Sequence, residues 1–280
     1  MVVALRPLLL QRHRRGKGFS YTYPNGSTVR DPATLRRIRA LAIPPAWTDV
    51  VVAESPDAHI QATGRDARGR KQYRYHARWI ELRDREKYDR LIAFTRVLPR
   101  IRAAVARDLR LRKLPTRKIL AALVAMLETC HMRIGNDEYA RENGSYGATT
   151  LENGHVRFKG RGAVELVYRA KGGIVRHVRV TDPRLTRVIR ACRALPGKRL
   201  FPVTSAEVNA YIADISHGPF TAKDFRTWGG TREYAKVYAA THDRKAALEA
   251  AAEALGNTCA VCRKSYIHPR VYAGDVRGFV

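Results

Sequence analysis

Residues 155–180 read HVRFKGRGAVELVYRAKGGIVRHVRV, and this stretch decides the fold class. It contains three runs in which apolar residues alternate with polar ones or follow one another. The runs occupy residues 155–158, 164–168 and 174–180. Glycine-containing turns separate them, and glycine permits the tight reversals that join neighbouring strands. A period of two is typical of strands with one buried face, so the stretch predicts a three-stranded antiparallel sheet.

Helical spacing of apolar residues dominates on both sides of this stretch. Before it, residues 117–131 form an amphipathic pattern, and so do residues 88–97, which Pro99 is expected to end. After it, helices are expected at residues 183–194, 205–215, 221–240, 243–255 and 258–267. The larger part of the chain is therefore predicted to be mainly α-helical around one small sheet.

The first part of the chain has a different pattern. Residues 19–75 have the alternation and turns of β structure, including the hairpin signal Pro24-Asn25-Gly26 and one short helix that starts at Asp31-Pro32. Further strands are expected at residues 50–52, 59–62 and 71–75. The sequence thus predicts an α+β protein with two domains. A small β-rich domain spans residues 1–85, and a larger, mainly α-helical domain with the three-stranded antiparallel sheet spans residues 86–280.

Positive charge is the strongest signal in the composition. The chain has 53 Lys and Arg against 25 Asp and Glu, a net charge of +28, while 45% of its residues are apolar. Residues 1–85 hold 17 basic and 7 acidic residues, so the excess lies in both predicted domains. A compact protein tolerates such a field best beside a polyanion, so nucleic acid is the expected partner. Charge alone leaves a ribosomal or RNA-binding protein open.

The four cysteines are Cys130, Cys192, Cys259 and Cys262. Cys259 and Cys262 have metal-ligand spacing, but a structural zinc site needs four ligands and no second pair exists. The pair also falls in a helical context, so helical packing is the preferred interpretation. No metal site and no cofactor are expected.

Targeting and membrane signals are weak. No run of about 18 apolar residues occurs, so no membrane-spanning helix is expected. The apolar start of the chain is interrupted by Arg6 and has no small-residue cleavage site, so a signal peptide is not expected. These features predict a cytoplasmic, nucleoid-associated protein.

Four segments could supply chemistry on a phosphate. The sequence has no P-loop, no glycine-rich nucleotide motif and no carboxylate cluster for Mg²⁺, so cationic side chains must hold the phosphate and a side chain must attack it. The segments are HMRIGNDEYA at 131–140, YRAKGG at 168–173, TAKDFRTW at 221–228 and LGNTCAVCRKSYIHP at 255–269.

These segments resemble the type IB DNA topoisomerases, in the small branch shared by bacteria and poxviruses. QATG at 61–64, KQYRYH at 71–76 and ENGSYG at 142–147 match as well, in the same order and spacing. The resemblance implies that a DNA-clamp domain and a catalytic domain close around duplex DNA. It further implies that one strand is cut and resealed, relaxing supercoils without ATP or a required metal.

The resemblance also implies roles for five residues. Tyr266 matches the nucleophile that forms a 3′-phosphotyrosine and releases a 5′-hydroxyl. Arg133 and Arg226 match the arginines that clamp the non-bridging oxygens, and Lys171 matches the hairpin lysine that protonates the leaving oxygen. Asn257 occupies a position held in this family by His or Asn.

Physical chemistry agrees with these roles. An arginine fork offers paired donors and stays charged, and a lysine can give up a proton, whereas the neutral amide of Asn257 cannot. The acid role therefore falls on Lys171. No general base for Tyr266 is evident: water or a neighbouring arginine is preferred over His268, which is expected to cap or pack, and His131 is expected to be structural.

Further DNA contacts follow from the resemblance. Gln72, Tyr73 and Tyr75 match a segment with which the family touches the major groove, and Tyr146 is expected near the active site. Glutamine can pair with a base edge, and tyrosine can reach phosphate or stack. An ordinary amphipathic strand remains the alternative for residues 71–75. The expected partner is duplex DNA, bound by a monomer without a small-molecule cofactor.

Two other classes of protein remain open. Tyrosine recombinases share this catalytic core, but they have an Arg-His-x-x-Arg-like pattern around the second arginine and a helical N-terminal domain. Here Lys223-Asp224-Phe225-Arg226 and the β-rich start favour the topoisomerase. A non-enzymatic binder would explain the charge, but not the spaced Arg, Lys, Arg, Asn and Tyr.

Overall fold

The computed structural model describes residues 9–160 and 162–280. The chain forms two compact units, one that ends at Lys87 and one that begins at Tyr88. Their fold class is α+β, as predicted: a sheet-based first unit is followed by a mainly helical one that contains a second, smaller sheet.

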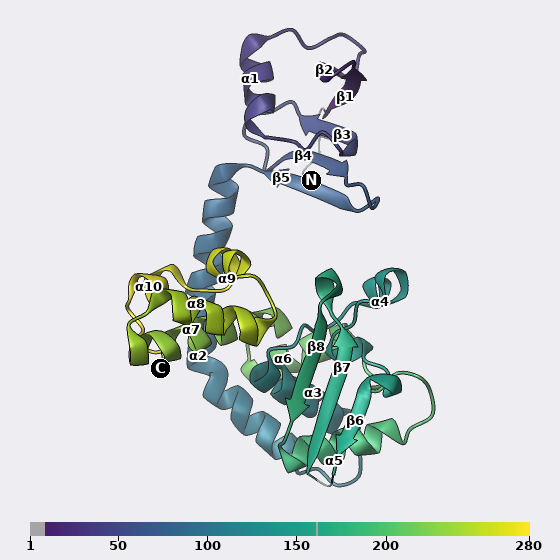
Figure 1. Cartoon of the computed structure of the whole chain (residues 1–280), viewed down its shortest axis with the longest axis vertical. Coiled ribbons are helices and arrows are strands. Elements are labelled where there is room, and N and C mark those ends of the chain that lie inside the picture. The colour runs from purple at the N-terminus through teal and green to yellow at the C-terminus, as the bar shows by residue number, and fades with distance from the viewer. Residues whose placement is uncertain (1–8, 161) are drawn as a thin grey trace. The chain divides into compact units, whose positions relative to one another are not determined.

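Five antiparallel strands form the sheet of the first unit, in the order β2-β1-β3-β4-β5 (Figure 1). The strands are β1 (Leu9–Arg15), β2 (Gly18–Thr22), β3 (Thr48–Ala53), β4 (Ile60–Arg65) and β5 (Lys71–Tyr75). Helix α1 (Pro32–Ala40) starts at Asp31, whose carboxylate accepts the backbone N–H of Thr34 at 2.7 Å. Ile38 of α1 joins Val50 and Val52 of β3 in one small core.

Strand β1 is not predicted by the alternation pattern, because only Leu10 in it is buried and the residues after it are polar. It forms a hairpin with β2 through a turn at Gly16, which has a left-handed φ of 56°. The predicted turn at Pro24-Asn25-Gly26 does reverse the chain. Its second arm, however, makes only a single bridge, between Thr22 and Thr28, and does not become a strand.

Helix α3 lies at the centre of the second unit. Its residues from Ile119 to Leu127 are nearly all buried, and they pack against α5, α6, α7 and β8. The helices of this unit are α2 (Ala77–Asp108), α3 (Thr116–Cys130), α4 (Asp137–Asn143), α5 (Pro183–Arg193), α6 (Ser205–Ser216), α7 (Ala222–Thr241), α8 (Arg244–Leu255), α9 (Cys259–Ser265) and α10 (Pro269–Ala273). The five helices predicted after the sheet are confirmed, each within about two residues at its ends.

Helix α2 corrects the prediction that Pro99 ends a helix. The helix continues through Pro99 to Asp108 and contains the boundary between the two units. An interior proline costs about 3 kcal/mol because it removes one backbone hydrogen bond and crowds the preceding turn. Phe94 and Leu98 before it and Ile101 after it are all buried in the core. Tertiary packing on both sides of Pro99 outweighs the local cost.

The three-stranded antiparallel sheet is confirmed, in the order β6-β7-β8. Its strands are β6 (Val156–Lys159), β7 (Ala163–Arg169) and β8 (Val175–Val180), drawn in teal and green in Figure 1. The β7–β8 turn contains a short 3₁₀ segment, η3 (Lys171–Gly173), in which Gly172 has a φ of 81°. Helix α4 was not predicted, because none of its seven residues is buried and the sequence therefore has no apolar period there.

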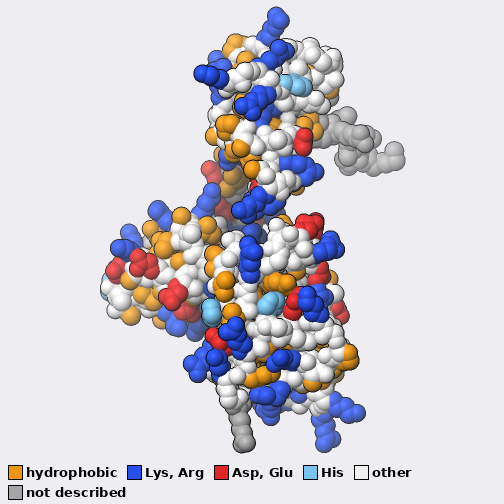
Figure 2. All heavy atoms as spheres, turned by 45° about the vertical axis from the view of Figure 1, so that its right-hand side comes forward, with side chains coloured by type: hydrophobic (Ala, Val, Ile, Leu, Met, Phe, Trp, Pro, Cys, Tyr) orange, Lys and Arg blue, Asp and Glu red, His pale blue; other side chains and the backbone are white. Residues whose placement is uncertain are grey.

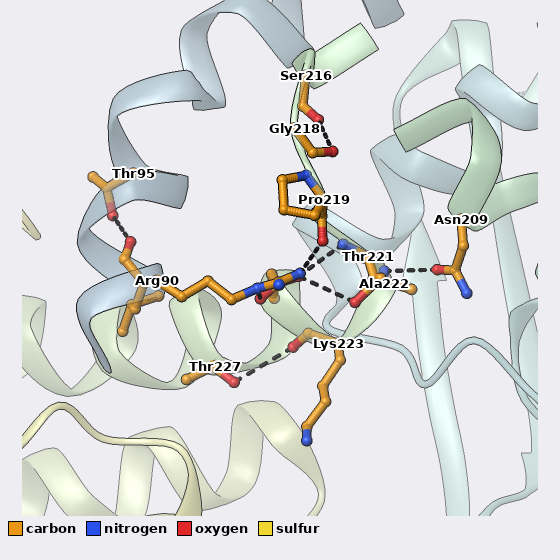
Figure 3. A network of polar contacts seen from close by, with 12 residues as sticks. Arg90, Thr95, Asn209, Ser216, Gly218, Pro219, Thr221, Ala222, Lys223 and Thr227 are labelled. Atoms are coloured by element: carbon orange, nitrogen blue, oxygen red, sulfur yellow. Dashed lines mark hydrogen bonds and ion pairs between the residues drawn. The ribbon is translucent and has the colours of Figure 1, made fainter. Parts of the chain in front are cut away.

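The start of α7 is fixed by contacts from two other helices (Figure 3). Arg90 of α2 donates from Nε and Nη2 to the two carboxylate oxygens of Asp224, each at 2.8 Å, and also to the carbonyl of Pro219. Asp224 in turn accepts the backbone N–H of Thr221 at 2.7 Å, and Asn209 of α6 accepts that of Ala222 at 3.0 Å. These bonds satisfy the backbone N–H groups of Thr221 and Ala222 and anchor the start of α7 to α2 and α6.

Lys and Arg side chains are spread over both units in the view of Figure 2. Within the part of the chain that the structure describes, no helix combines the length and the apolar character that a bilayer crossing requires.

Candidate active site

Arg226 of α7 is a buried cation, with only 5% of its surface exposed. Its Nη1 donates to the carbonyl of His131, and its Nη2 donates to the carbonyl of Leu255 at 3.0 Å. Its Nε is also buried and has no hydrogen-bond acceptor among the described residues. The guanidinium is therefore held by the backbone of two distant segments and keeps one donor uncommitted.

Arg133 and Asn257 form a pair next to Arg226. Arg133 lies in the segment after α3, and its Nη2 donates to Oδ1 of Asn257 at 2.6 Å. Asn257 follows α8, and its backbone N–H donates to the carbonyl of Ala252 at 2.9 Å. Hydrogen bonds with a charged donor are short and about twice as strong as neutral ones. The loop after α8 therefore orients the guanidinium of Arg133.

Tyr266 lies directly after α9 and is half-buried. The guanidinium carbon of Arg226 is 5.3 Å from the centre of its ring. Burial raises the pKa of the Tyr266 phenol. The charge of Arg226, a hydrogen bond from Arg226 and the charges of Arg133 and Lys171 together outweigh burial, and the pKa lies below its ordinary value. Cations favour the phenolate over the phenol. Loss of the Tyr266 proton is thus favoured by the surrounding charge.

The positive charge of Arg226 is retained at neutral pH. Burial, and to a lesser extent the charge of Arg133, lower its pKa to about 10. That pKa is still well above 7, so the guanidinium remains protonated at neutral pH.

Lys171 is exposed in the turn between β7 and β8, the hairpin position that the sequence predicts. Arg176 of β8 ties this hairpin to the C-terminal end of α8, because its guanidinium donates to the carbonyls of Glu253 and Ala254 at 3.3 and 3.0 Å. The same α8 end leads into Asn257. Arg176 was not singled out from the sequence, because one arginine among many in a basic chain carries no distinguishing signal.

Four predicted site residues therefore lie together: Arg133, Arg226, Asn257 and Tyr266. The charge of Lys171 acts on Tyr266 from the hairpin turn. Three of the four sit at helix ends or on α7, so the core of the second unit determines their spacing.

Tyr146 is engaged within the protein. Its hydroxyl donates to Glu152 at 3.5 Å, its ring lies edge-on to that of His155 at 4.4 Å, and its backbone N–H donates to the carbonyl of Arg169 at 2.8 Å. The last bond links the Tyr146 segment to the end of β7, directly before the turn that carries Lys171.

The predicted DNA contacts of β5 divide between the two faces of its sheet. Tyr73 and Tyr75 are 41% and 43% exposed, and their rings stack with centres 5.9 Å apart. Gln72 points to the opposite face, where its side-chain amide donates to Asp66 at 3.0 Å. The register places Gln72 and Arg74 on the side of α1, and the two tyrosines on the open side.

His268 caps α10, as predicted, since its Nδ1 accepts the backbone N–H of Arg270 at 3.1 Å. The ring of His131 is buried beside Gly229, with Nε2 at 3.8 Å from Glu233. Cys262 lies in α9 and is fully buried, and burial raises the pKa of its thiol. Among residues 9–160 and 162–280, no group of three or more His, Cys, Asp or Glu is placed to hold a metal ion.

Thr231 of α7 contacts the Tyr266 segment and was missed by the sequence analysis. Its hydroxyl donates to the carbonyl of Tyr266 at 2.8 Å. The sequence offered no way to separate it from Thr227, one turn earlier on the same helix.

Two family descriptions match the chain. Residues 76–266 match the eukaryotic DNA topoisomerase I catalytic core, a range that contains all five predicted catalytic residues. Residues 18–66 match the bacterial DNA topoisomerase IB N-terminal domain.

Similar proteins include viral enzymes. DNA topoisomerase 1B of Acanthamoeba polyphaga mimivirus is 30% identical over 285 residues, covering 92% of this chain and 84% of the relative. DNA topoisomerase 1B of Vaccinia virus (strain Copenhagen) is 26% identical over 123 residues, 42% of this chain and 39% of the relative. Among solved structures, the post-cleavage complex of the XerH site-specific recombinase has a TM-score of 0.42 at 17% identity, covering 61% of this chain and 47% of that one. The chain belongs to the type IB DNA topoisomerase family, with that family's catalytic core and a bacterial-type N-terminal domain.

Proposed function

We propose that this chain relaxes supercoiled duplex DNA by cutting and resealing one strand through Tyr266. The observation that carries the proposal is the half-buried Tyr266 phenol beside the buried guanidinium of Arg226, with Arg133 next to both. Nucleophile and phosphate-binding cations are thereby gathered at one place, which transfer of a phosphoryl group to a side chain requires.

The reaction runs in two balanced steps. The Tyr266 oxygen attacks a DNA phosphorus, the bond to the 5′ oxygen breaks, and a 3′-phosphotyrosine forms while Lys171 protonates the leaving oxygen. After the downstream duplex has rotated, the 5′-hydroxyl attacks the phosphotyrosine, returns its proton to Lys171 and displaces Tyr266. The number of phosphoester bonds is conserved, so resealing needs no ATP.

Each cationic residue has a distinct part. Arg133 and Arg226 hold the non-bridging oxygens, where negative charge gathers in the transition state. Asn257 orients Arg133 and can donate a neutral hydrogen bond to phosphate. The Tyr266 proton leaves to water, because the surrounding cations stabilise the phenolate.

The remaining residues bind DNA outside the reacting bond. Residues 1–85 act as the clamp domain and residues 86–280 as the catalytic domain of a monomer associated with the nucleoid. Tyr73 and Tyr75 contact DNA from the open face of the sheet. Gln72 contacts DNA from the same strand, and Tyr146 contacts it near the cleaved phosphate. Exposure of the two stacked tyrosines supports the first of these contacts.

A plasmid assay tests the proposal. Wild-type protein, Tyr266→Phe and Tyr272→Phe are incubated with supercoiled plasmid in EDTA without ATP. Tyr272 is a matched control, because it also lies under an arginine, Arg263 at 4.9 Å, but in the neighbouring helix α10. We expect relaxation and a detergent-trapped protein–DNA adduct with wild type and Tyr272→Phe only. Relaxation by Tyr266→Phe at the wild-type rate would contradict the proposal.

A further inference from the structure

Thr231 joins α7 to the backbone around Tyr266. Its side chain is fully buried, and it lies five residues after Arg226 on the same helix. Its hydroxyl donates to the carbonyl of Tyr266 at 2.8 Å and accepts the backbone N–H of His268 at 3.1 Å. One hydroxyl thus acts as donor to the residue before Ile267 and as acceptor from the residue after it.

Gly230 allows the close approach that this bond needs. A Cβ at this position would lie 3.1 Å from Cβ of Tyr266 and 2.8 Å from a methyl group of Leu255. Both distances are shorter than normal carbon–carbon contacts, so a larger residue would push the Tyr266 segment away from α7. Ile267, the next residue after Tyr266, is 1% exposed and belongs to the hydrophobic core.

The remaining backbone contact of Tyr266 is local. Its N–H donates to the carbonyl of Cys262 at 2.9 Å, within the last turn of α9. That bond sets the end of α9 but does not relate Tyr266 to Arg226. Thr231 links the backbone of Tyr266 to the helix that carries Arg226, in addition to the contact between the Arg226 guanidinium and the Tyr266 side chain.

We propose that Thr231 is a positioning residue, whose hydroxyl holds Tyr266 at the distance from Arg226 that attack on the phosphate requires. The inference rests on the proposed function of Tyr266 as nucleophile. Arg226 and Thr231 are about 7.5 Å apart along the axis of one helix, at a rise of about 1.5 Å per residue. Because that helix is anchored at its start by Arg90 and Asn209, it sets the spacing between guanidinium and phenol.

The proposal predicts a rate effect and not a binding effect. A displacement of about 1 Å at a reacting group can reduce a rate by about 10²-fold. Thr231→Val keeps the size and branching of the side chain but removes the hydroxyl. We expect it to slow single-turnover adduct formation on saturating DNA about 10- to 100-fold, with the Kd for DNA unchanged. Thr231→Ser restores the hydroxyl and should recover most of the rate.

Thr227→Val is the matched control. Thr227 is also buried, at 4% exposed, but its hydroxyl donates to the backbone carbonyl of Lys223 within α7, at 3.4 Å. We expect this variant to form the adduct at the wild-type rate. Thermal melting of all variants, together with the final amount of adduct, separates a slower reaction from a smaller folded fraction.

The pH–rate profile gives a readout that general loosening of the fold would not move. In wild type, Arg226, Arg133 and Lys171 hold the pKa of Tyr266 below its ordinary value. Moving the phenol away from them raises that pKa, so the cleavage profile of Thr231→Val should shift to higher pH and that of Thr231→Ser should not. A wild-type rate and profile in Thr231→Val would overturn the inference, and so would equal slowing in Thr231→Val and Thr227→Val with unshifted profiles.

Tyr266→Phe is assayed in parallel to separate the two proposals. If Tyr266→Phe forms the adduct, the proposed function itself fails. If Tyr266→Phe is inert while Thr231→Val reacts like wild type, only the positioning role of Thr231 fails.

Discussion

The two units expose their DNA-facing candidates to very different extents. Arg226 in the second unit is 5% exposed and is bonded to two backbone carbonyls, whereas Tyr73 and Tyr75 in the first unit are 41% and 43% exposed. A buried charge is poorly screened and needs no reorganisation when negative charge develops beside it. An exposed aromatic pair on an edge strand can bind a surface but cannot exclude water. We therefore expect substitutions in the second unit to change the reaction rate and substitutions in the first to change the affinity for DNA.

The comparison predicts the largest effect for Arg226→Ala. Removing one donor that stabilises a transition-state oxyanion costs about 10²- to 10³-fold in rate, and we expect single-turnover adduct formation to fall by at least that much. The control is Arg232→Ala on the same helix, whose side chain is 39% exposed. If both variants reacted at the same rate, burial of Arg226 would have no bearing on the reaction.

A smaller effect is expected for Asn257→Ala. The substitution removes the acceptor that holds Arg133 at 2.6 Å, so Arg133 samples other positions. Hydrogen bonds to charged groups contribute about 1.5–3 kcal/mol, which corresponds to about a 10- to 100-fold loss of adduct formation. Asn153→Ala, which removes an amide bonded to the carbonyl of Gly197 in an exposed loop, serves as control and should react normally. An unchanged rate in Asn257→Ala would show that Arg133 needs no partner.

The smallest effect is expected in the first unit. The double variant Tyr73→Ala/Tyr75→Ala should weaken DNA binding about 10-fold, because each lost phenol hydrogen bond contributes about 0.5–1.5 kcal/mol. The cleavage rate at saturating DNA should stay unchanged. Gln72→Ala should weaken binding less, because Gln72 is bonded to Asp66. A slower cleavage rate at saturating DNA in the tyrosine variant would contradict the expectation that the first unit affects only affinity.

Secondary structure was predictable wherever burial leaves a period in the sequence. The β6–β8 sheet and helices such as α5 have clear apolar patterns, and they form as predicted. Strand β1 and helix α4 bury almost nothing, so they leave no period to detect. Helix α2 passes through Pro99 because distant residues pack on both sides of it, which local rules cannot anticipate.

The candidate site residues were chosen from motifs, but the contacts that hold them could not be predicted from the sequence. Arg226 is held by the carbonyls of His131 and Leu255, which lie 95 and 29 residues away in sequence. Every residue has a carbonyl, so no residue type marks these positions. The hydroxyl of Thr231 reaches across 35 residues to Tyr266 in the same way. Motifs select the candidate side chains, whereas the contacts that hold them come only from the fold.

The buried Nε of Arg226 is a hydrogen-bond donor that a bound phosphate could use. A buried donor without an acceptor lowers the stability of the folded protein by about 1–3 kcal/mol. A phosphate that accepted from it would bind the folded chain and not the unfolded one, and so would stabilise the fold by mass action. Molecules on DNA should therefore unfold and be degraded more slowly than free ones. The amount of this protein in a cell would then follow the amount of DNA available to it.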